Sequence, residues 1–296
     1  MDTVFIVNPA SGKRKNPELL TATIESKYKS VRKAFRIEHT RYAGHGTQIA
    51  KEAVKAGTEL IVAAGGDGTM NEVACGLVGS DSVLGLIPCG SGNGFARSMG
   101  IPLDHSEALD VLMTGNCRRI DAGMVNEYYF FGTCGLGFDA DISAHFQNFG
   151  VRGSLPYFYI AVKEHFKYRP EDIRLISAEG DSNINIYLLT VANTQQYGNS
   201  AYIAPQADVQ DGLLDVCIIK PFTMFQLMVN LHRLFNKTVD KFPAYSLFRS
   251  KEIAIIRKRE IGWFHVDGEP HRGGSKLKIK VIPSCLKVCC PVEETA

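Results

Sequence analysis

The sequence predicts an α/β N-terminal domain with a parallel sheet, followed by a mostly β-sandwich C-terminal domain. Short apolar runs without alternation, such as Leu60 to Ala64 and Val83 to Ile87, are typical of strands buried on both faces of a parallel sheet. Each of these runs is followed by glycine-rich sequence and then by helical sequence. Near Arg118 the pattern changes to many short strands separated by turns, which indicates an antiparallel sandwich or barrel.

The composition of the chain limits the classes of protein to which it can belong. A chain of 296 residues with 45% apolar residues can form one large or two ordinary domains. The 33 basic and 31 acidic residues nearly balance, so the charge predicts no nucleic-acid partner. Neither a signal peptide nor a membrane-spanning run is expected, and the eight cysteines are scattered without paired CxxC units. These features predict a cytoplasmic protein without a zinc site.

The N-terminal elements alternate between strand and helix. Strands are expected at 3–7, 34–38, 60–64 and 83–87, with helices at about 17–28 and 48–56 and after each glycine-rich segment. The four strands are followed by Asn8, Thr40, Gly65 and Pro88. Because ligands bind at the carboxyl ends of the strands in an open parallel sheet, these four segments are expected to face one crevice.

Two glycine-rich loops in series favour phosphate binding. Gly65, Gly66 and Gly68 allow a sharp turn and close approach of a ligand to backbone amides. Thr69 and Glu72 have the spacing of a capping box, which predicts a helix start, and a helix N-terminus attracts anions. A tight connection without a ligand is the alternative for one such loop. Neither GxxxxGK[ST] nor GxGxxG is present, so a P-loop enzyme or a dinucleotide-binding dehydrogenase is poorly supported.

The second half predicts short strands and two helices. The helices are expected near 157–168 and 225–235, and Asn126-Glu127 is expected to form a hairpin turn. Asp121 and Asp215 are interpreted as residues on exposed strand faces. The expected strands are 120–125, 128–134, 173–178, 184–191, 213–219, 253–256, 277–282 and 286–289. The domain boundaries are therefore placed at 1–118 and 119–282.

An ordered set of motifs resembles the diacylglycerol kinase catalytic-domain superfamily, which includes soluble bacterial lipid kinases, sphingosine and ceramide kinases and, more distantly, the NAD kinases. The set spans nearly the whole chain. The resemblance implies a nucleotide-binding domain followed by a β-sandwich lipid-substrate domain, with a tail of about 283–296 that could return to the first domain. The motifs are Asn8-Pro9-Ala10-Ser11-Gly12, Thr40, Gly65-Gly66-Asp67-Gly68-Thr69 with Asn71-Glu72, Pro88 to Asn93, Asp211-Gly212 and Asp267-Gly268-Glu269.

The resemblance also implies binding residues. A structural Mg²⁺ would be bound by the Asp211 carboxylate and by the backbone carbonyls of Asp208 and Leu213. Gly94 stands where many bacterial members of the superfamily carry an acid, and the loop form is closer to that of sphingosine kinases. ATP would be bound by Asn8, Pro9, Ala10, Ser11, Gly12, Thr40, Gly66, Asp67, Gly68, Thr69, Met70, Asn71, Glu72 and Ser91.

Two acids are the catalytic candidates. Asp67 could orient Mg²⁺ on the phosphates or act as a base, because phosphoryl transfer depends on positioning and charge neutralisation; a turn aspartate is the alternative. Glu269 is the base that the resemblance implies. The alternation of His265, Asp267, Glu269 and His271 leaves open a metal cluster, and Asp267-Gly268 leaves open a plain hairpin turn. We expect a turn that presents Glu269 to the acceptor hydroxyl.

The predicted activity is an ATP- and Mg²⁺-dependent lipid kinase. Diacylglycerol-like glycerolipid is the first expected acceptor, and a sphingoid base or ceramide is the second. An NAD kinase and a non-catalytic nucleotide-binding protein remain alternatives. Transient contact with a membrane surface during turnover is expected, and a homodimer is left open. Apolar aromatic sequence in the second half favours a lipid: Tyr128 to Phe131, Phe146, Phe149, Tyr157 to Ile160 and Phe225 to Phe235.

Overall fold

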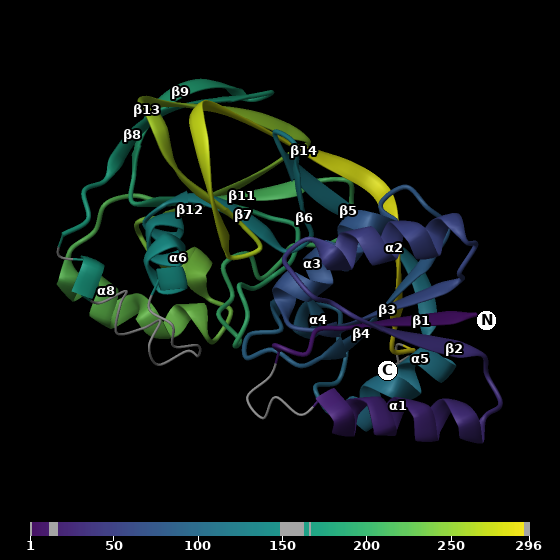
Figure 1. The fold of residues 1–296 in the computed structure, drawn as a ribbon. Helices are drawn as coiled ribbons and strands as arrows, with labels where there is room; N and C mark the ends of the chain where they lie inside the picture. The colour runs from purple at the N-terminus through teal and green to yellow at the C-terminus, as the bar shows by residue number, and fades with distance from the viewer. Residues whose placement is uncertain (1, 12–16, 149–162, 166, 293–296) are drawn as a thin grey trace. The chain divides into compact units, whose positions relative to one another are not determined.

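The computed structural model describes residues 2–11, 17–148, 163–165 and 167–292 (Figure 1). The chain divides into two compact units: unit 1 comprises Met1–Ile120 and Ser284–Ala296, and unit 2 comprises Asp121–Pro283. Each unit has a buried apolar core of its own.

Unit 1 is built on a parallel sheet. The strand order is β4-β3-β1-β2, and every neighbouring pair in it is parallel. The end of β14 (Glu269–Cys290) adds a further parallel strand, because Lys287 and Val288 pair with Val83 and Leu84. The elements are β1 (Thr3–Val7), α1 (Pro17–Ser30), β2 (Phe35–His39), α2 (His45–Lys55), β3 (Leu60–Gly65), α3 (Asp67–Leu77), β4 (Val83–Pro88), α4 (Gly94–Ser98) and α5 (His105–Thr114).

Helices cover both faces of this sheet, as Figure 1 shows. On one face, α1 and α5 pack against strand residues in a core that includes Ile24, Tyr28, Phe5 and Leu109. On the other face, α3 contacts β3, α2 contacts β1, and the two helices contact each other. Strands β1, β3 and β4 are buried throughout, as their unbroken apolar sequence predicts. The predicted parallel α/β class is confirmed for this unit.

Unit 2 is mostly antiparallel β-structure. Its main ladder runs β12-β11-β10-β7-β13-β14, while β8 pairs with β13 and β9, and β5 pairs with β6. The elements are β5 (Asn116–Val125, which begins in unit 1), β6 (Tyr128–Phe130), β7 (Thr133–Gly137), α6 (Phe138–Asn148), β8 (Glu171–Ser177), β9 (Gly180–Ile186), β10 (Leu188–Ala192), β11 (Leu214–Ile219), α8 (Met224–Asn230), η1 (Leu231–Leu234), η2 (Val239–Lys241), β12 (Tyr245–Ser250), β13 (Glu252–Val266) and β14 (Glu269–Cys290).

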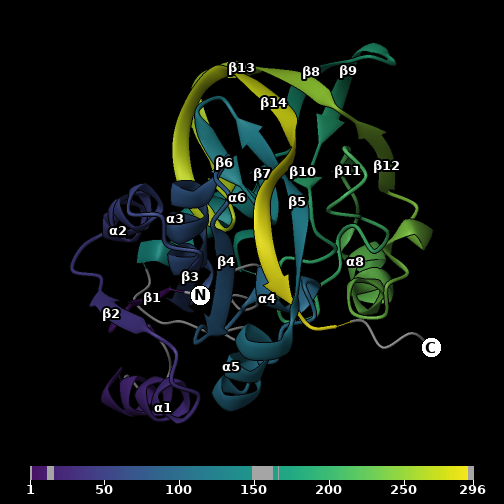
Figure 2. The same cartoon turned by 90° about the vertical axis from the view of Figure 1, so that its right-hand side faces the viewer.

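The mostly β class of unit 2 is confirmed, but several element boundaries differ from those predicted. The strand expected at 128–134 is two strands, because the amides of Phe131, Gly132 and Thr133 bind a side chain instead of continuing one ladder. The strand expected at 184–191 is also two, β9 and β10, which pair with different partners. The two strands expected at 277–282 and 286–289 are one long strand, β14, which Figure 2 shows as a curved ribbon.

The helices predicted for unit 2 agree only in part with the structure. The predicted helix at 225–235 is α8 followed by the 3₁₀ turn η1. Most of the helix predicted at 157–168, together with Phe149, lies outside the described residues, as do the side chain of Phe146 and all of Gly12. Helices α5 and α6 and strand β12 were not predicted. The predicted hairpin turn at Asn126-Glu127 is present, because Val125 and Tyr128 face each other in the ladder.

The interpretation of Asp121 and Asp215 as exposed-face residues was wrong. Their exposed fractions are only 1% and 2%. Asp121 accepts a hydrogen bond from the Gly212 amide, and Asp215 lies in a strand that is buried on both faces. A buried carboxylate requires partners of this kind, because burial removes it from water.

Candidate active site

The carboxyl ends of the parallel strands in unit 1 lie at one edge of its sheet. Asn8 follows β1, Thr40 follows β2, and Gly65 and Pro88 end β3 and β4. The backbone amide of Asn8 donates to Ala64 O, the amide of Thr40 to Val7 O, and the amide of Cys89 to Gly65 O. The four segments that were predicted to share a crevice are thus joined by backbone hydrogen bonds at this edge.

The two glycine loops lie against each other. A Cβ atom on Gly90 would lie 2.8 Å from Gly66 Cα, and one on Gly66 would lie 3.3 Å from Gly90 Cα. A Cβ atom on Gly65 would lie 2.4 Å from Thr69 Oγ1. The absence of side chains at these three positions allows the backbones to pack directly.

Helix α3 begins at Asp67, with Gly66 as its N-cap and no side-chain cap. The predicted capping box was therefore wrong. Thr69 Oγ1 instead accepts a hydrogen bond from Asn8 Nδ2 at 2.9 Å. This contact joins the loop after β1 to the first turn of α3, where the helix dipole favours an anion.

Glu72 has a different function from the one that the capping box implied. Its Oε1 accepts from the Gly44 amide at 2.8 Å and its Oε2 from the Gly46 amide at 2.9 Å. The carboxylate therefore caps the N-terminus of α2, where a negative charge is favourable. Thr47 Oγ1 also donates to Glu72 O, so Glu72 joins α3 to the segment that follows Thr40.

Asp67 lies against the second loop. Its Oδ1 accepts from the Phe95 amide at 3.4 Å, and a Cβ atom on Gly92 would lie 3.1 Å from Oδ2. The second loop is shaped by Asn93, whose side chain accepts from the Gly90 amide and donates to Gly90 O, both at 2.9 Å. Asn93 occupies the N-cap position of α4 with a φ of 49°, and this left-handed conformation reverses the chain direction at the second loop.

The other residues of the implied ATP site also belong to unit 1. Asn8 Oδ1 accepts from the Ala10 amide, and the Ser11 amide donates to Asn8 O, so the segment from Asn8 to Ser11, including Pro9, is a tight turn. Ser91 is exposed, and Met70 is buried beneath the loop. Gly68 has open space around its missing Cβ, and Asn71 Oδ1 accepts from the Cys75 thiol. The structure thus brings the described members of this set to one edge of one sheet.

In unit 2, Asp267 and Gly268 form the two-residue turn between β13 and β14. Both have positive φ, 48° and 83°, and Val266 faces Glu269 in the ladder. The Asp267 carboxylate accepts three backbone amides, from Phe131, Gly132 and Thr133, at 2.8–3.0 Å. Asp267 is thus an anchor that joins the turn to the start of β7, and Glu269, the next residue after the turn, is exposed.

A buried network beside this turn contains His265, the only one of its side-chain members that the sequence analysis named. Asp139 Oδ2 accepts from Thr190 Oγ1 at 2.9 Å and lies 3.2 Å from His265 Nε2. His265 Nδ1 accepts from the Gly268 amide at 3.4 Å, so Nε2 carries the proton that faces Asp139. The network therefore leads from α6 to the turn before Glu269. A Cβ atom on Gly135 would lie 2.5 Å from Asp139 Oδ2, so only glycine fits there.

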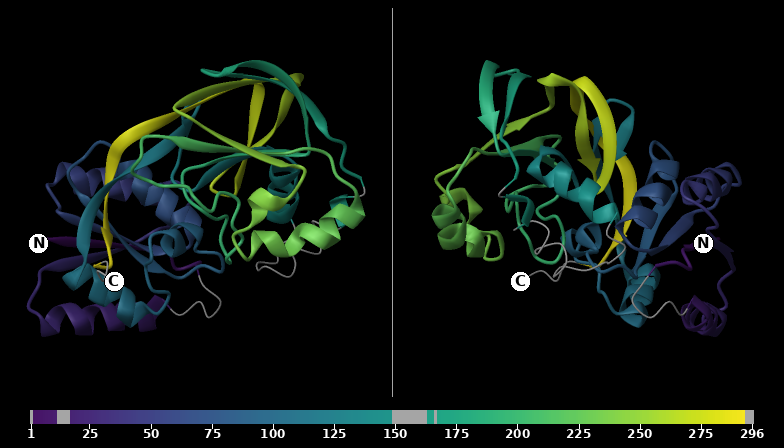
Figure 3. Two further views of the ribbon diagram at one scale, coloured as in Figure 1. Left: turned by 180° about the vertical axis from the view of Figure 1, so that it is seen from behind. Right: turned by 60° about the vertical axis from the view of Figure 1, so that its left-hand side comes forward.

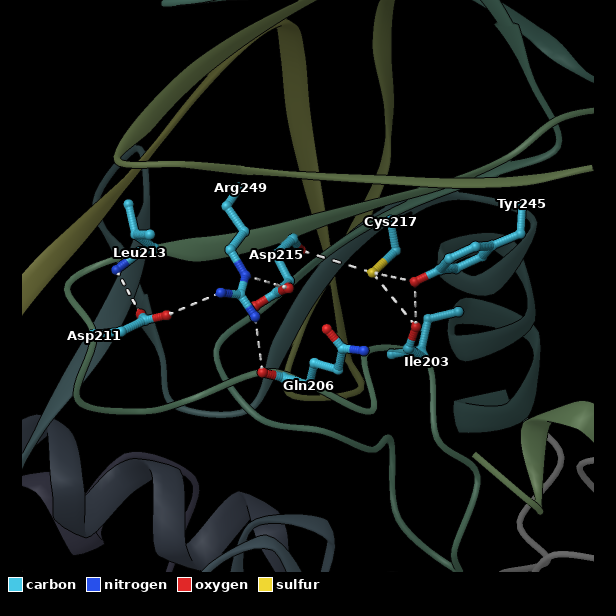
Figure 4. A network of polar contacts seen from close by, with 8 residues as sticks. All are labelled: Ile203, Gln206, Asp211, Leu213, Asp215, Cys217, Tyr245 and Arg249. Carbon is cyan, nitrogen blue, oxygen red and sulfur yellow. Dashed lines mark hydrogen bonds and ion pairs between the residues drawn. The ribbon is translucent and has the colours of Figure 1, made fainter. Parts of the chain in front are cut away.

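The three residues implied for a structural metal lie in and next to the loop before β11. Asp208 Oδ1 accepts from the Gln210 amide, and Asp211 Oδ1 accepts from the Leu213 amide, each at 2.9 Å. Figure 4 shows that Asp211 also faces the Arg249 guanidinium, with 3.8 Å between Oδ2 and Nη1. Glu269 and these three residues all belong to unit 2.

Within the described ranges, every helix is too short or too polar to span a lipid bilayer. All eight cysteines are free thiols. Burial raises the pKa of the Cys89 thiol, at the start of the second glycine loop, to about 11. Cys89 is therefore protonated near neutral pH and is a poor nucleophile.

Comparison with known proteins finds similarity along both units. Residues 2–125 match the family model described as "Diacylglycerol kinase catalytic domain", and residues 132–290 match the one described as "YegS C-terminal NAD kinase beta sandwich-like domain". A "Probable lipid kinase YegS-like" of Chromohalobacter salexigens is 34% identical over 236 residues, which cover 78% of this chain and 75% of that protein. A "Diacylglycerol kinase" of Bacillus subtilis is 34% identical over 226 residues, which cover 73% of each chain.

Solved structures show the same fold. Two crystal structures from Bacillus anthracis superpose with TM-scores of 0.81 and 0.73 at 20% and 19% identity. The alignments cover 98% of this chain and 95% and 96% of the other chains. At this identity the likeness concerns the fold.

Proposed function

Because this chain belongs to the diacylglycerol kinase catalytic-domain family of lipid kinases, we propose that it transfers the γ-phosphoryl group of ATP to a hydroxyl group of a membrane lipid. The observation that carries this proposal is the sheet edge in unit 1 where the loops at Gly66 and Gly90 pack backbone to backbone beside the N-terminus of α3. Such an edge offers backbone amides to a phosphate chain without side-chain obstruction.

The ATP site would be built from three loops. The Asn8–Thr69 hydrogen bond holds the loop after β1 against the first turn of α3, and Glu72 holds the segment after β2. The glycine loop from Gly66 to Gly68 would bring its backbone amides close to the phosphate oxygens, with the helix dipole adding attraction for negative charge. Ser91 would contribute its hydroxyl from the second loop.

Asp67 is the acidic residue at this sheet edge that could hold the Mg²⁺ ion bound to ATP. Asp67 places a carboxylate, an oxygen ligand that Mg²⁺ favours, directly at the glycine loop and against the second loop. The ion would neutralise negative charge on the phosphates during transfer. Asp67 would position the ion or its water ligands, while the amide of Phe95 holds the carboxylate in place.

Glu269 is the proposed base for the acceptor hydroxyl. Its carboxylate is exposed at the start of β14, and the preceding residue pair is anchored by the three amide bonds of Asp267. A base needs hydrogen-bond reach of the hydroxyl proton and a defined position. Glu269 would accept that proton as the hydroxyl oxygen attacks the γ-phosphorus, and ADP would leave.

A membrane lipid is the proposed acceptor, with a diacylglycerol-like glycerolipid first and a sphingoid base or ceramide second. The Bacillus subtilis relative is named a diacylglycerol kinase, which supports the first choice. Helix α8 supports contact of the protein with a membrane surface. All residues of this helix are described, and none of them is buried. Phe225, Met228 and Val229 are 71%, 66% and 50% exposed. In the left view of Figure 3, α8 lies to one side of the strands of unit 2.

NAD is the second candidate acceptor. The family model that matches unit 2 is described as NAD kinase-like, and the glycine-Asp-Gly-Thr loop would serve either acceptor. A lipid acceptor is preferred because large apolar side chains such as Phe225 and Met228 are exposed in this unit, whereas a dinucleotide needs polar groups around its ribose and base.

A phosphotransfer screen tests the proposal. Labelled ATP with MgCl₂ is incubated with dioleoylglycerol, sphingosine, ceramide or NAD, the lipids being presented in mixed micelles that contain an anionic phospholipid. We expect label in the glycerolipid and none in NAD. NADP formation with inert lipids would make the protein an NAD kinase. ATP binding without transfer to any acceptor would instead support the non-catalytic alternative.

A further inference from the structure

The loop before β11 is held by backbone contacts that use the acids implied for a structural metal. One carboxylate oxygen of Asp208 and one of Asp211 accept the amides two residues further on, as in Asx-turns. Asp121 Oδ2 accepts the Gly212 amide at 2.7 Å, and its own amide donates to Val209 O. These bonds join the loop to β5 and engage one oxygen of the Asp211 carboxylate, the side-chain ligand implied for the metal.

A guanidinium group occupies the position next to these acids. Arg249 lies directly opposite Asp215 in the β11–β12 ladder, which directs its side chain toward the loop. Its Nε lies 3.3 Å from Asp215 Oδ1, its Nη1 lies 3.8 Å from Asp211 Oδ2, and its Nη2 donates to Gln206 O at 3.0 Å (Figure 4). One cation thus connects the loop, the segment before it and the strand after it.

The electrostatics of Asp215 fit this arrangement. Asp215 is 2% exposed, while the Arg249 side chain is 39% exposed. The guanidinium can therefore stay hydrated on one side while it satisfies a buried carboxylate on the other.

These residues do not fit a Mg²⁺ site. Magnesium demands near-octahedral oxygen ligation at about 2.0–2.1 Å, and it would share Asp211 with a guanidinium of the same sign. Gly94 also stands where many bacterial members of the superfamily carry an acid, so that acid is not available to this chain.

We propose that Arg249 supplies the cation that holds residues 206–213 to β11 in this chain, in place of a structural magnesium ion. The guanidinium carries out the charge neutralisation and the cross-linking that a divalent ion would otherwise perform. Any Mg²⁺ that accompanies ATP in unit 1 is a separate requirement. The inference concerns stability, so its test does not depend on the proposed activity.

The first measurement uses the unaltered chain without nucleotide. Its Tm is measured after EDTA treatment and desalting into metal-free buffer, and again in a titration with MgCl₂. We expect the Tm to stay the same within about 1 °C, because binding of an ion to the folded state would raise it with concentration. A Tm that falls on chelation and returns with saturable magnesium dependence would overturn the proposal.

The second measurement uses Arg249→Met, with Arg174→Met as a matched control. Arg174 also pairs with an aspartate across two strands, Asp181, but both side chains are largely exposed. We expect Arg249→Met to lower Tm by about 2–4 °C or more, and Arg174→Met to lower it by less. Equal shifts in the two variants would contradict the proposal. If Arg249→Met does not fold, Arg249→Lys, which keeps the charge but loses the three-way contact, should show the lowered Tm.

Discussion

At the scale of single residues, Asp67 and Glu269 are acids in different settings. Asp67 is the first residue of α3 and lies against the second glycine loop, whereas Glu269 is exposed after an anchored turn. The surroundings of each acid support one proposed role: positioning of a metal–phosphate group for Asp67 and proton acceptance for Glu269.

Asp67→Asn should lower turnover by about 10²-fold or more, because it removes the negative charge at a site where electrostatic stabilisation of phosphoryl transfer is needed. The amide keeps the volume of the side chain, so the Tm should change little. Asp110→Asn is the control, because Asp110 is exposed on α5 and its carboxylate pairs with Lys27. Normal turnover of Asp67→Asn with a normal melting curve would reject the role.

Glu269→Gln should slow transfer by about 10²-fold and leave ATP binding unchanged, the usual result when a base is lost. Turnover and nucleotide affinity are measured separately, the second by calorimetry with a non-hydrolysable ATP analogue. Glu179→Gln, in the exposed turn before β9, serves as the control. Weaker nucleotide binding with preserved turnover would show that Glu269 has been assigned wrongly.

At the scale of elements, α8 differs from the helices of unit 1. Helices α2, α3 and α5 each bury several residues, as amphipathic helices on a sheet do. Helix α8 buries none, yet a complete capping box formed by Thr223 and Gln226 stabilises its N-terminus. A short helix with this many exposed apolar side chains suits a lipid surface.

The double variant Phe225→Ser with Met228→Ser should therefore bind lipid vesicles more weakly and raise the apparent KM for lipid presented in them. The Tm should not fall, because neither side chain is buried. Ile261→Ser is the matched control, since Ile261 is 68% exposed on another element of unit 2. Vesicle sedimentation measures the binding. Equal sedimentation of all three proteins would contradict a membrane role for α8.

At the scale of the whole molecule, the chain crosses between its units and returns. Strand β5 begins in unit 1 and ends in unit 2, and β14 begins in unit 2 and ends beside β4 in unit 1. Leu286, Val288, Cys289 and Cys290 are buried there, within unit 1. The nucleotide-binding unit is thus completed by the last part of the sequence.

Val288→Asp should consequently destabilise unit 1 by several kcal/mol, because it places an unpaired charge at a fully buried position. Val292→Asp, four residues later at a side chain that is 54% exposed, should have almost no effect. Chemical unfolding with a nucleotide-binding readout compares the two. A similar small shift for both would show that the end of β14 contributes little to unit 1.

The sequence by itself determined the class of both units and the edge at which the loops of unit 1 meet. Unbroken apolar runs of about five residues between turn signals are typical of strands covered on both faces, and glycines after them allow close backbone approach, so local patterns sufficed for this part. The tertiary structure alone decided how polar side chains pair. Glu72 binds amides 26 and 28 residues away, Asp267 binds amides more than 130 residues away, and Arg249 lies opposite Asp215. The spacing of residues along the chain does not reveal such partners, because they depend on which strands and helices pack together.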